Sequence, residues 1–307
     1  MGKRALIFLS VFFLSILIPF GQKGAKGGTD YVGTESCKGC HEDTYKGFLK
    51  SVHGKKAISG SPMNREGCEA CHGPGAQHAE KGGGRGVDIF AFGKKVDAKE
   101  KTAKCLACHG ESKPLVFWDM SRHRSVQVSC DHCHSVHSAA VKEKNLRARE
   151  PDLCYSCHRD IRVKANKQSR HPINEGKIRC NDCHNPHGAF STKLVKADSV
   201  NELCYRCHSE KRGPFMWPHP PVEENCLNCH VTHGSNHSKL LTHKVPQLCQ
   251  SCHNWRGHPG TIYTGFETFQ GTATAGKNRM FARSCLNCHS NIHGSNGPSA
   301  RGKTFVR

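Results

Sequence analysis

The feature that most constrains this chain is a five-residue pattern, Cys-x-x-Cys-His, that occurs ten times. The chain has 307 residues and 20 cysteines, and every cysteine belongs to one of these patterns. Because 23 of the 307 residues are His, chance would place a His after a given cysteine pair in only about 7% of cases. The patterns begin at Cys37, Cys68, Cys105, Cys130, Cys154, Cys180, Cys204, Cys226, Cys249 and Cys285.

Cys-x-x-Cys-His is the attachment sequence of c-type haem, in which the cysteines form thioether bonds and the His becomes an axial ligand of the iron. A disulfide framework explains paired cysteines but not the His that follows each pair. Zinc ribbons also pair cysteines, but they do not require the same fifth residue ten times. We therefore predict ten covalently bound haem c groups, and no cysteine remains for a disulfide or a thiol nucleophile.

We number the haem sites 1 to 10 in the chain order of their motifs. The predicted thioether cysteines are Cys37, Cys40, Cys68, Cys71, Cys105, Cys108, Cys130, Cys133, Cys154, Cys157, Cys180, Cys183, Cys204, Cys207, Cys226, Cys229, Cys249, Cys252, Cys285 and Cys288. The predicted motif ligands of the iron are His41, His72, His109, His134, His158, His184, His208, His230, His253 and His289.

A second set of ten histidines recurs along the chain and predicts the opposite ligands. The motifs group into five two-haem units, which are Cys37–His78, Cys105–His137, Cys154–His187, Cys204–His233 and Cys249–His293. Each unit contains two histidines besides its motif histidines, which are His53 and His78, His123 and His137, His171 and His187, His219 and His233, and His258 and His293. Because no Met recurs at a matched position, we predict ten bis-His irons. His132, His237 and His243 fall outside the repeat and are predicted not to be ligands.

The stretch "CNDCHNPHG" (180–188) places His184 and His187 three residues apart. Three extended residues span only about 10 Å, which is too little to pass from one face of a porphyrin to the other. His187 is therefore predicted to bind a neighbouring haem. The same argument applies to His137, His233 and His293, so these segments should each join two irons. The sequence does not assign each opposite ligand to a particular haem.

The fold predicted from this pattern is a multihaem cytochrome c. Hydrophobic residues make up 36% of the chain, and about 28 residues per haem are too few for an ordinary core. We expect mostly coil with short α-helices that carry the motifs, an elongated row of ten haems, and little or no β-sheet. Gly82–Gly86 and the segment before Cys285 have the composition of surface loops.

The N-terminal segment 1–27 has the features of a secretory signal peptide. Lys3 and Arg4 precede an apolar run, Ala5–Phe20, which is short for a membrane span of about 20 residues. Retention as an uncleaved anchor is the alternative. Either way the body of the chain is exported, and in an envelope with two membranes we predict a periplasmic location; its association with the outer membrane is implied by the family resemblance described below.

The formal net charge is +20, a value that would ordinarily suggest an acidic partner. Signal-peptide cleavage and ten ferric haems, each with two ionised propionates, bring the charge to about +6. The basic residues therefore balance the propionates, and no nucleic-acid partner is predicted.

Several stretches resemble the MtrA/DmsE family of decahaem cytochromes. They are "CEACHGPGAQH" (68–78), "EGKIRCNDCHNPHG" (175–188), "SVNELCYRCHSEKRGPF" (199–215), "PVEENCLNCHVTHGSNHSKLL" (221–241) and "SCLNCHSNIHGSN" (284–296). The resemblance implies two pentahaem halves, 28–175 and 176–307. It also implies an outer-membrane β-barrel porin as partner, with periplasmic and extracellular redox partners that include other multihaem cytochromes.

The function that the resemblance implies is extracellular electron transfer by a protein that is not an enzyme. A soluble periplasmic electron shuttle would share every motif and lack only the porin. A multihaem reductase would need an iron with a free face, and the ten-for-ten count of histidines predicts none. The direction of electron flow is not indicated by the sequence.

Overall fold

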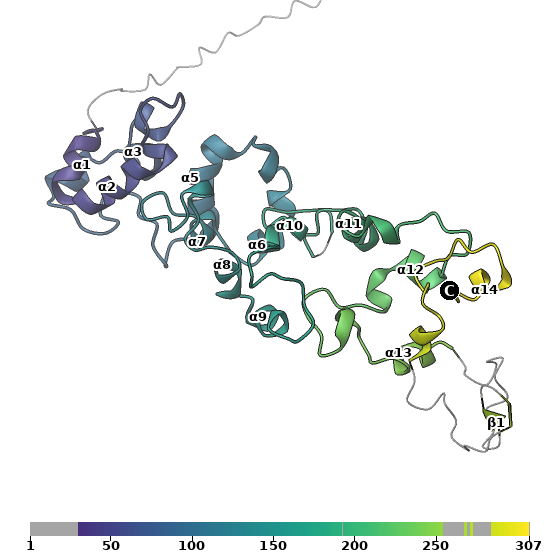
Figure 1. Cartoon of the computed structure of the whole chain (residues 1–307). Coiled ribbons are helices and arrows are strands. Elements are labelled where there is room, and N and C mark those ends of the chain that lie inside the picture. The colour runs from purple at the N-terminus through teal and green to yellow at the C-terminus, as the bar shows by residue number, and fades with distance from the viewer. Residues whose placement is uncertain (1–29, 192, 254–266, 269–270, 273–283, 307) are drawn as a thin grey trace, which may run out of the picture.

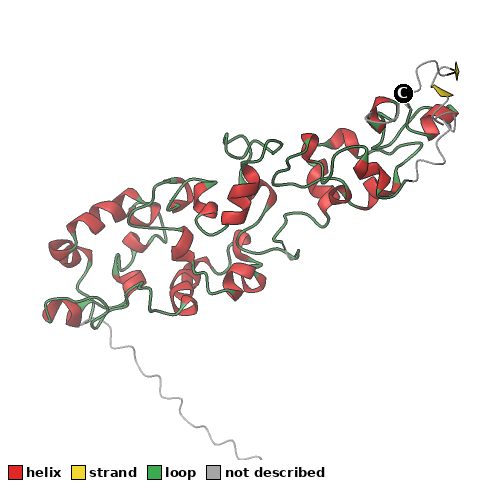
Figure 2. Ribbon diagram, turned by 90° about the horizontal axis from the view of Figure 1, so that it is seen from below, coloured by secondary structure: helices red, strands yellow, loops and turns green. Residues whose placement is uncertain are grey.

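The computed structural model describes residues 30–191, 193–253, 267–268, 271–272 and 284–306. The predicted signal peptide and His258 lie outside the described residues. Figure 1 shows an elongated molecule in which chain order follows the long axis, from α1–α3 at one end to α13 and α14 at the other. The perpendicular view in Figure 2 shows the same extended shape, with short helices joined by long irregular segments.

The helices are short and spread over the whole described chain. They are α1 (Thr34–Cys40), α2 (Glu42–Lys50), α3 (Glu69–His72), α4 (Ala76–Glu80), α5 (Ala98–His109), α6 (Arg122–Ser125), α7 (Cys130–Cys133), α8 (Asp152–Tyr155), α9 (Arg159–Ala165), α10 (Cys180–Cys183), α11 (Val200–Tyr205), α12 (Pro220–Glu224), α13 (Gln247–Gln250) and α14 (Ala300–Lys303). Single 3₁₀ turns include Cys226–Asn228 and Cys285–Asn287. The one sheet among the described residues is the two-residue pair of β1 (Glu267–Thr268) and β2 (Gly271–Thr272).

Each motif folds into one helical turn, because its His N–H donates to the carbonyl oxygen of the first cysteine. The bond is 2.9 Å from His134 to Cys130 and 3.0 Å from His184 to Cys180. A turn of helix places positions i, i+3 and i+4 on one face. The two cysteines and the His of a motif therefore point to the same side, as attachment to one porphyrin requires.

The polypeptide has almost no apolar core of its own. Four apolar side chains are buried among the described residues, and they are Phe48, Trp118, Tyr155 and Ala165. A domain that folds on apolar burial needs far more than this. The prediction of short helices, coil and little sheet is confirmed, and so is the loop at Gly82–Gly86, where four glycines have positive φ. No helix among the described residues is both long and apolar enough to cross a membrane.

Candidate haem sites

The predicted iron ligands meet in pairs, each formed by one motif histidine and one non-motif histidine. Nine such pairs are seen, with ring centroids 5.9 to 6.4 Å apart. In chain order of the motifs they are His41–His78, His72–His137, His109–His53, His134–His187, His158–His123, His184–His233, His208–His171, His230–His293 and His253–His219.

This separation fits an iron between two imidazoles. A metal–nitrogen bond of about 2 Å on each side, plus the half-width of each ring, places the centroids about 6.3 Å apart. Aromatic rings in ordinary contact scatter over about 4.5–7 Å. Nine pairs within half an ångström of one another, joining segments of very different sequence separation, therefore indicate one common ligand geometry.

The pairs cross the boundaries of the two-haem units in a regular way. The first motif of a unit meets a histidine from the preceding unit, as His158 meets His123. The second motif meets a histidine from the following unit, as His184 meets His233. The N-terminal unit has no predecessor, and its first motif histidine, His41, meets His78 of the same unit. Successive units are thus joined by reciprocal exchange of ligands.

His187 follows the prediction from chain reach. Its ring lies 6.0 Å from His134 of haem site 4, with an interplanar angle of 18°. His184, three residues earlier, faces His233 instead. The segment "CNDCHNPHG" therefore contributes to two different irons.

Contacts between cysteines place the haem sites in chain order. The first cysteines of the two motifs in a unit touch, as the thiol of Cys105 does with that of Cys130, a contact that raises the Cys105 pKa. The second cysteines approach across units, as Cys133 does toward Cys157. The same alternation runs through the remaining described motifs. Each haem site thus neighbours the one before and the one after it, which makes a single row.

One imidazole at each iron is held by a backbone carbonyl, with a single exception described below. At site 6, His184 Nδ1 lies 2.8 Å from the oxygen of Lys193, and at site 5, His123 Nδ1 lies 2.8 Å from that of Pro186. A carbonyl oxygen only accepts, so Nδ1 carries the hydrogen and Nε2 is left bare for the metal. The other anchored rings are His72, His78, His134, His171, His219, His230 and His289.

Haem site 3 is the exception. Its anchored ring, His53, meets the side-chain amide of Asn145, with Nδ1 and Nδ2 3.3 Å apart. Asn145 is 7% exposed. The amide oxygen of an Asn can replace a carbonyl as acceptor once the group is turned. Asn145 therefore takes the part that the backbone plays at the other sites.

Burial lowers the pKa of six non-motif rings, and this favours the neutral form that an iron ligand needs; they are His53, His137, His187, His219, His233 and His293. Burial and the neighbouring His134 lower the pKa of His187 to about 4. Burial likewise lowers the pKa of His293 to about 4, with a smaller contribution from Lys211. Both imidazoles are uncharged at pH 7.

The polypeptide also leaves donors for the haem propionates. Trp118 Nε1 and Arg170 Nε are buried and meet no acceptor among the residues that the structure describes. Each belongs to a segment with an iron-facing histidine, since Arg170 precedes His171 and Trp118 lies five residues before His123. Buried donors of this kind normally have a partner, and a carboxylate of the haem suits them.

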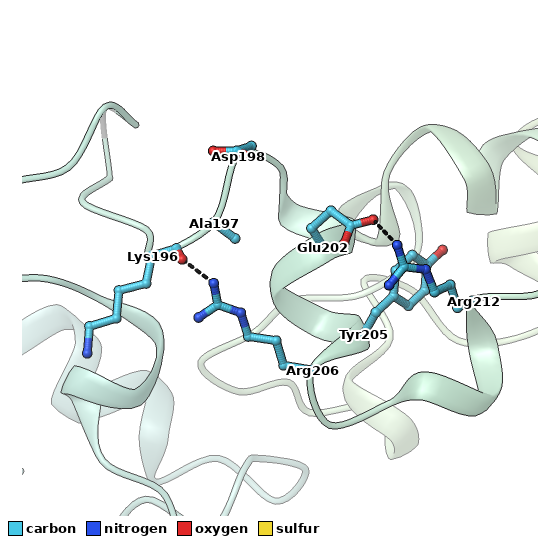
Figure 3. A pocket seen from close by; sticks show the side chains of 7 residues that line it. All are labelled: Lys196, Ala197, Asp198, Glu202, Tyr205, Arg206 and Arg212. Carbon is cyan, nitrogen blue, oxygen red and sulfur yellow. Dashed lines mark hydrogen bonds and ion pairs between the residues drawn. The ribbon is translucent and has the colours of Figure 1, made fainter.

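A polar recess of about 290 Å³ lies beside the junction of sites 6 and 7 (Figure 3). It is lined by Lys196, Ala197, Asp198, Glu202, Tyr205, Arg206 and Arg212. Arg206 donates to the carbonyl oxygen of Lys196, and Arg212 pairs with Glu202 at 3.2 Å. Lys196 also lowers the pKa of the Cys183 thiol, although burial has the larger, opposite effect. These side chains would suit the propionates of bound haems as counter-charges.

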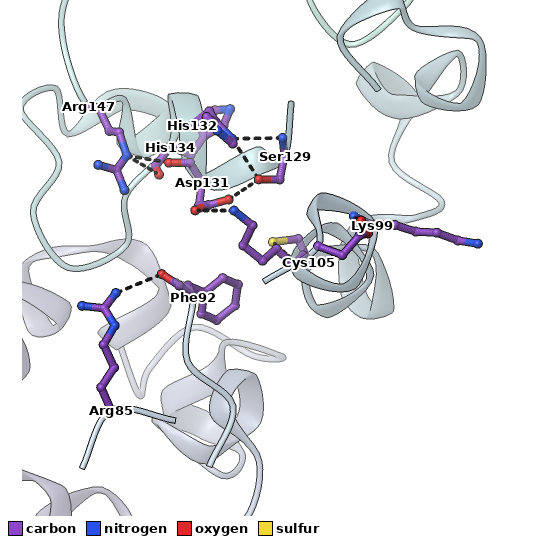
Figure 4. A network of polar contacts seen from close by, with 11 residues as sticks. Arg85, Phe92, Lys99, Cys105, Ser129, Asp131, His132, His134 and Arg147 are labelled. Carbon is purple, nitrogen blue, oxygen red and sulfur yellow. Dashed lines mark hydrogen bonds and ion pairs between the residues drawn. The ribbon is translucent and has the colours of Figure 1, made fainter. Parts of the chain in front are cut away.

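A buried polar network supports the motif of site 4 (Figure 4). Lys101, only 6% exposed, pairs with Asp131 at 3.7 Å, and Asp131 also accepts from Ser129 Oγ. His132 Nδ1 accepts from the Ser129 N–H at 3.1 Å and so caps the helix α7. This role agrees with the prediction that His132 is not a ligand.

The chain is similar to known proteins both in its doubled motifs and along most of its length. A model of the doubled CXXCH motif matches residues 123–163, 171–213 and 219–258. The multihaem cytochrome MtrA of Shewanella baltica (strain OS185) is 42% identical over 284 residues, which cover 91% of this chain and 84% of the relative. The chain belongs to the MtrA family of multihaem c-type cytochromes. Its ten motifs make it a decahaem member, and its activity is electron transfer and not catalysis.

The doubled-motif match marks a repeat that differs in phase from the five units read from the sequence. Each matched segment contains both members of one histidine pair, such as His123 and His158 in 123–163. Each also contains a second motif histidine whose partner lies further along the chain, beyond that segment, such as His134 with His187. The pairs His134–His187 and His171–His208 cross residue 175, so two irons join the predicted pentahaem halves. The division into halves stays a prediction.

Sequence reasoning missed the carbonyl anchors and Asn145. The anchors are backbone atoms, so no side-chain pattern reports them. His243, predicted not to be a ligand, has Nδ1 3.2 Å from the Thr242 hydroxyl.

Proposed function

We propose that this cytochrome carries electrons between the periplasm and the cell exterior, as the haem-bearing part of a complex with an outer-membrane porin. The row of histidine pairs carries the proposal. Each pair fixes one iron, and the exchange of ligands between units holds adjacent irons in a continuous series. Bis-His ligation closes both faces of an iron, so the sites pass electrons and do not bind substrate.

The ten proposed irons are held by the motif histidines and by the ten non-motif histidines predicted above, including His258. The haem supplies the redox chemistry, and the chain supplies position, ligands and counter-charges. Lys and Arg side chains near the row, such as Arg206 and Arg212, neutralise propionates and keep the adjacent haems close together.

A porin is the partner that the chemistry of this chain requires for transfer across a membrane. The described chain is polar, and its irregular segments expose backbone groups that lipid cannot satisfy. A polar lumen removes that cost. The partners at the two ends are proposed to be periplasmic and extracellular redox proteins that include other multihaem cytochromes, because transfer from haem to haem needs only close approach of two porphyrin edges.

The test is transfer across a sealed vesicle. The cytochrome is purified from detergent-extracted outer membranes together with any porin, and placed in liposomes that contain a redox dye. Reduction of the enclosed dye by an external donor that cannot cross lipid is the expected result, and liposomes with porin alone are the control. Recovery of the cytochrome only in the soluble periplasmic fraction would favour the electron shuttle instead. A stoichiometric high-spin ferric signal would favour a reductase.

A further inference from the structure

The carboxylate of Glu69 is buried beside the two N-terminal haem sites. Glu69 follows Cys68 directly, at the start of α3, and is 3% exposed. Its Oε1 accepts from the N–H groups of Val32 at 3.1 Å and Gly75 at 2.8 Å, and its Oε2 accepts from the N–H of Gly33 at 2.8 Å. The two carboxylate oxygens of Glu69 thus accept hydrogen bonds from three backbone N–H groups.

No cation neutralises this charge at close range within the described chain. The ion pairs of the described residues do not include Glu69. Lys104 is close enough to Cys71 to lower its thiol pKa slightly against the effect of burial, but Lys104 is exposed and screened by water. Of these two charges, the negative charge of Glu69 is shielded from solvent and the positive charge of Lys104 is not.

The residue that directly follows the first cysteine differs among the second motifs of the other four units, and it is charged only at site 4. It is Asp131 at site 4, where Lys101, itself buried, pairs with it at 3.7 Å. It is Asn181 at site 6, Leu227 at site 8 and Leu286 at site 10. Glu69 is thus the one unpaired anion of the series.

Two contacts bring this charge to sites 1 and 2 together. Glu69 lies inside the motif of site 2, between its two cysteines. It also contributes to the raised pKa of Cys37, the first cysteine of site 1, whose thiol meets that of Cys68. A buried negative charge stabilises ferric over ferrous iron, because the ferric haem carries one more positive charge and the local dielectric is low.

We propose that Glu69 lowers the reduction potentials of haems 1 and 2. The inference rests on the electron-transfer role proposed above, but it does not depend on the porin.

The experiment is a redox titration of the purified decahaem protein, followed by its absorbance and its low-spin paramagnetic resonance signals. Glu69→Gln removes the charge and keeps the shape. Glu66→Gln is the matched control, because it removes an exposed carboxylate three residues away. With Glu69→Gln, we expect two of the ten haems to shift to more positive potential. At a fixed potential their ratio of reduced to oxidised iron should rise at least tenfold, which is about 59 mV for one electron.

A titration of mature Glu69→Gln that superimposes on the wild type would overturn the proposal and leave Glu69 a purely structural anchor. Glu69→Asp separates charge from shape if Glu69→Gln does not mature. It keeps the charge but shifts the carboxylate by one methylene, so the proposal expects the wild-type titration even where thermal stability falls. A tenfold shift in Glu69→Asp would show that the geometry of the hydrogen bonds, and not the charge, sets these potentials. Because the protein is tested alone, a negative result here leaves the proposed function across the membrane untouched.

Discussion

His123 Nδ1 lies 2.8 Å from the carbonyl oxygen of Pro186, and Pro186 is the residue before His187. The two histidines face different irons, since His123 meets His158 and His187 meets His134. The same relation joins His171 to Thr232, before His233, and joins His219 to Ile292, before His293. One hydrogen bond thus joins the ring that faces one iron to the backbone beside the ring that faces the neighbouring iron. Displacement of one ring is therefore transmitted to the other.

Substitution of His187 by Ala should open the iron of haem 4, although His187 lies in the segment that carries haem 6. We expect one of ten haems to become high-spin in the paramagnetic resonance spectrum of the oxidised protein. The haem is identified by removing attachment sites in this background. The signal should vanish in Cys130→Ala/Cys133→Ala and persist in Cys180→Ala/Cys183→Ala. The reverse pattern would refute the pairing, and His243→Ala should leave all haems low-spin.

Substitution of Asn145 by Leu should affect haem 3 alone. Leu194 and Leu240 occupy the matching turns after the motifs of sites 6 and 8, so the side chain is compatible with this local backbone. Loss of the acceptor for His53 Nδ1 makes that imidazole a weaker donor to iron. Comparable changes to hydrogen-bond partners of metal ligands reduce metal affinity or activity on the order of 10- to 100-fold. A redox titration should show one haem shifted to higher potential. Asn145→Asp, which keeps an acceptor and adds a negative charge, should hold that potential at or below the wild-type value; equal upward shifts in both variants would exclude this role.

Substitution of Gly188 by Ala should destabilise the protein. Gly188 has φ +130°, and an added Cβ would lie 2.0 Å from the carbonyl oxygen of Phe117. A residue with a β-carbon in such a backbone conformation lowers the free energy of unfolding by about 1 kcal/mol or more. The collision with Phe117 adds to this loss. Gly176→Ala is the control, because its φ is +71° but nothing lies within 4 Å of the added carbon. The apparent midpoint of thermal unfolding should fall further for Gly188→Ala, and equal losses would show that the collision is relieved.

Substitution of Trp118 by Phe tests the proposed propionate donor. Removing a hydrogen bond to a carboxylate raises the pKa of that carboxylate. The reduction potential of one haem should therefore depend on pH in a range closer to neutral pH. The sign is fixed, since protonation of the propionate at lower pH removes negative charge and raises the potential. Redox titrations at several pH values measure the effect. In Trp217→Phe the lost donor served the carbonyl oxygen of Gly297 at 2.8 Å, so stability should fall with no new pH dependence.

The meeting of motif with non-motif histidines was predictable in part, because covalent chemistry fixes the spacing of the motifs. Cysteines at i and i+3 with His at i+4 share a helical face, and the short reach from His184 to His187 excludes a common iron. The partner of each ring was not predictable, because it depends on how segments as distant as His53 and His109 fold together. The anchoring carbonyls of Pro186 and Lys193 belong to backbone conformation, which residue types specify only weakly.

The pairing of His134 with His187 and of His72 with His137 has a consequence for assembly. A chain emerges N-terminus first during synthesis and export, so the second motif of each of the first four units emerges before the segment that supplies its partner histidine. An attached haem therefore waits with one face open until later residues arrive, and each new segment closes its predecessor. The haems of such a chain are therefore completed in order from the N-terminus. In a truncated chain, the haem on the last second motif keeps one face open to oxygen and other small ligands.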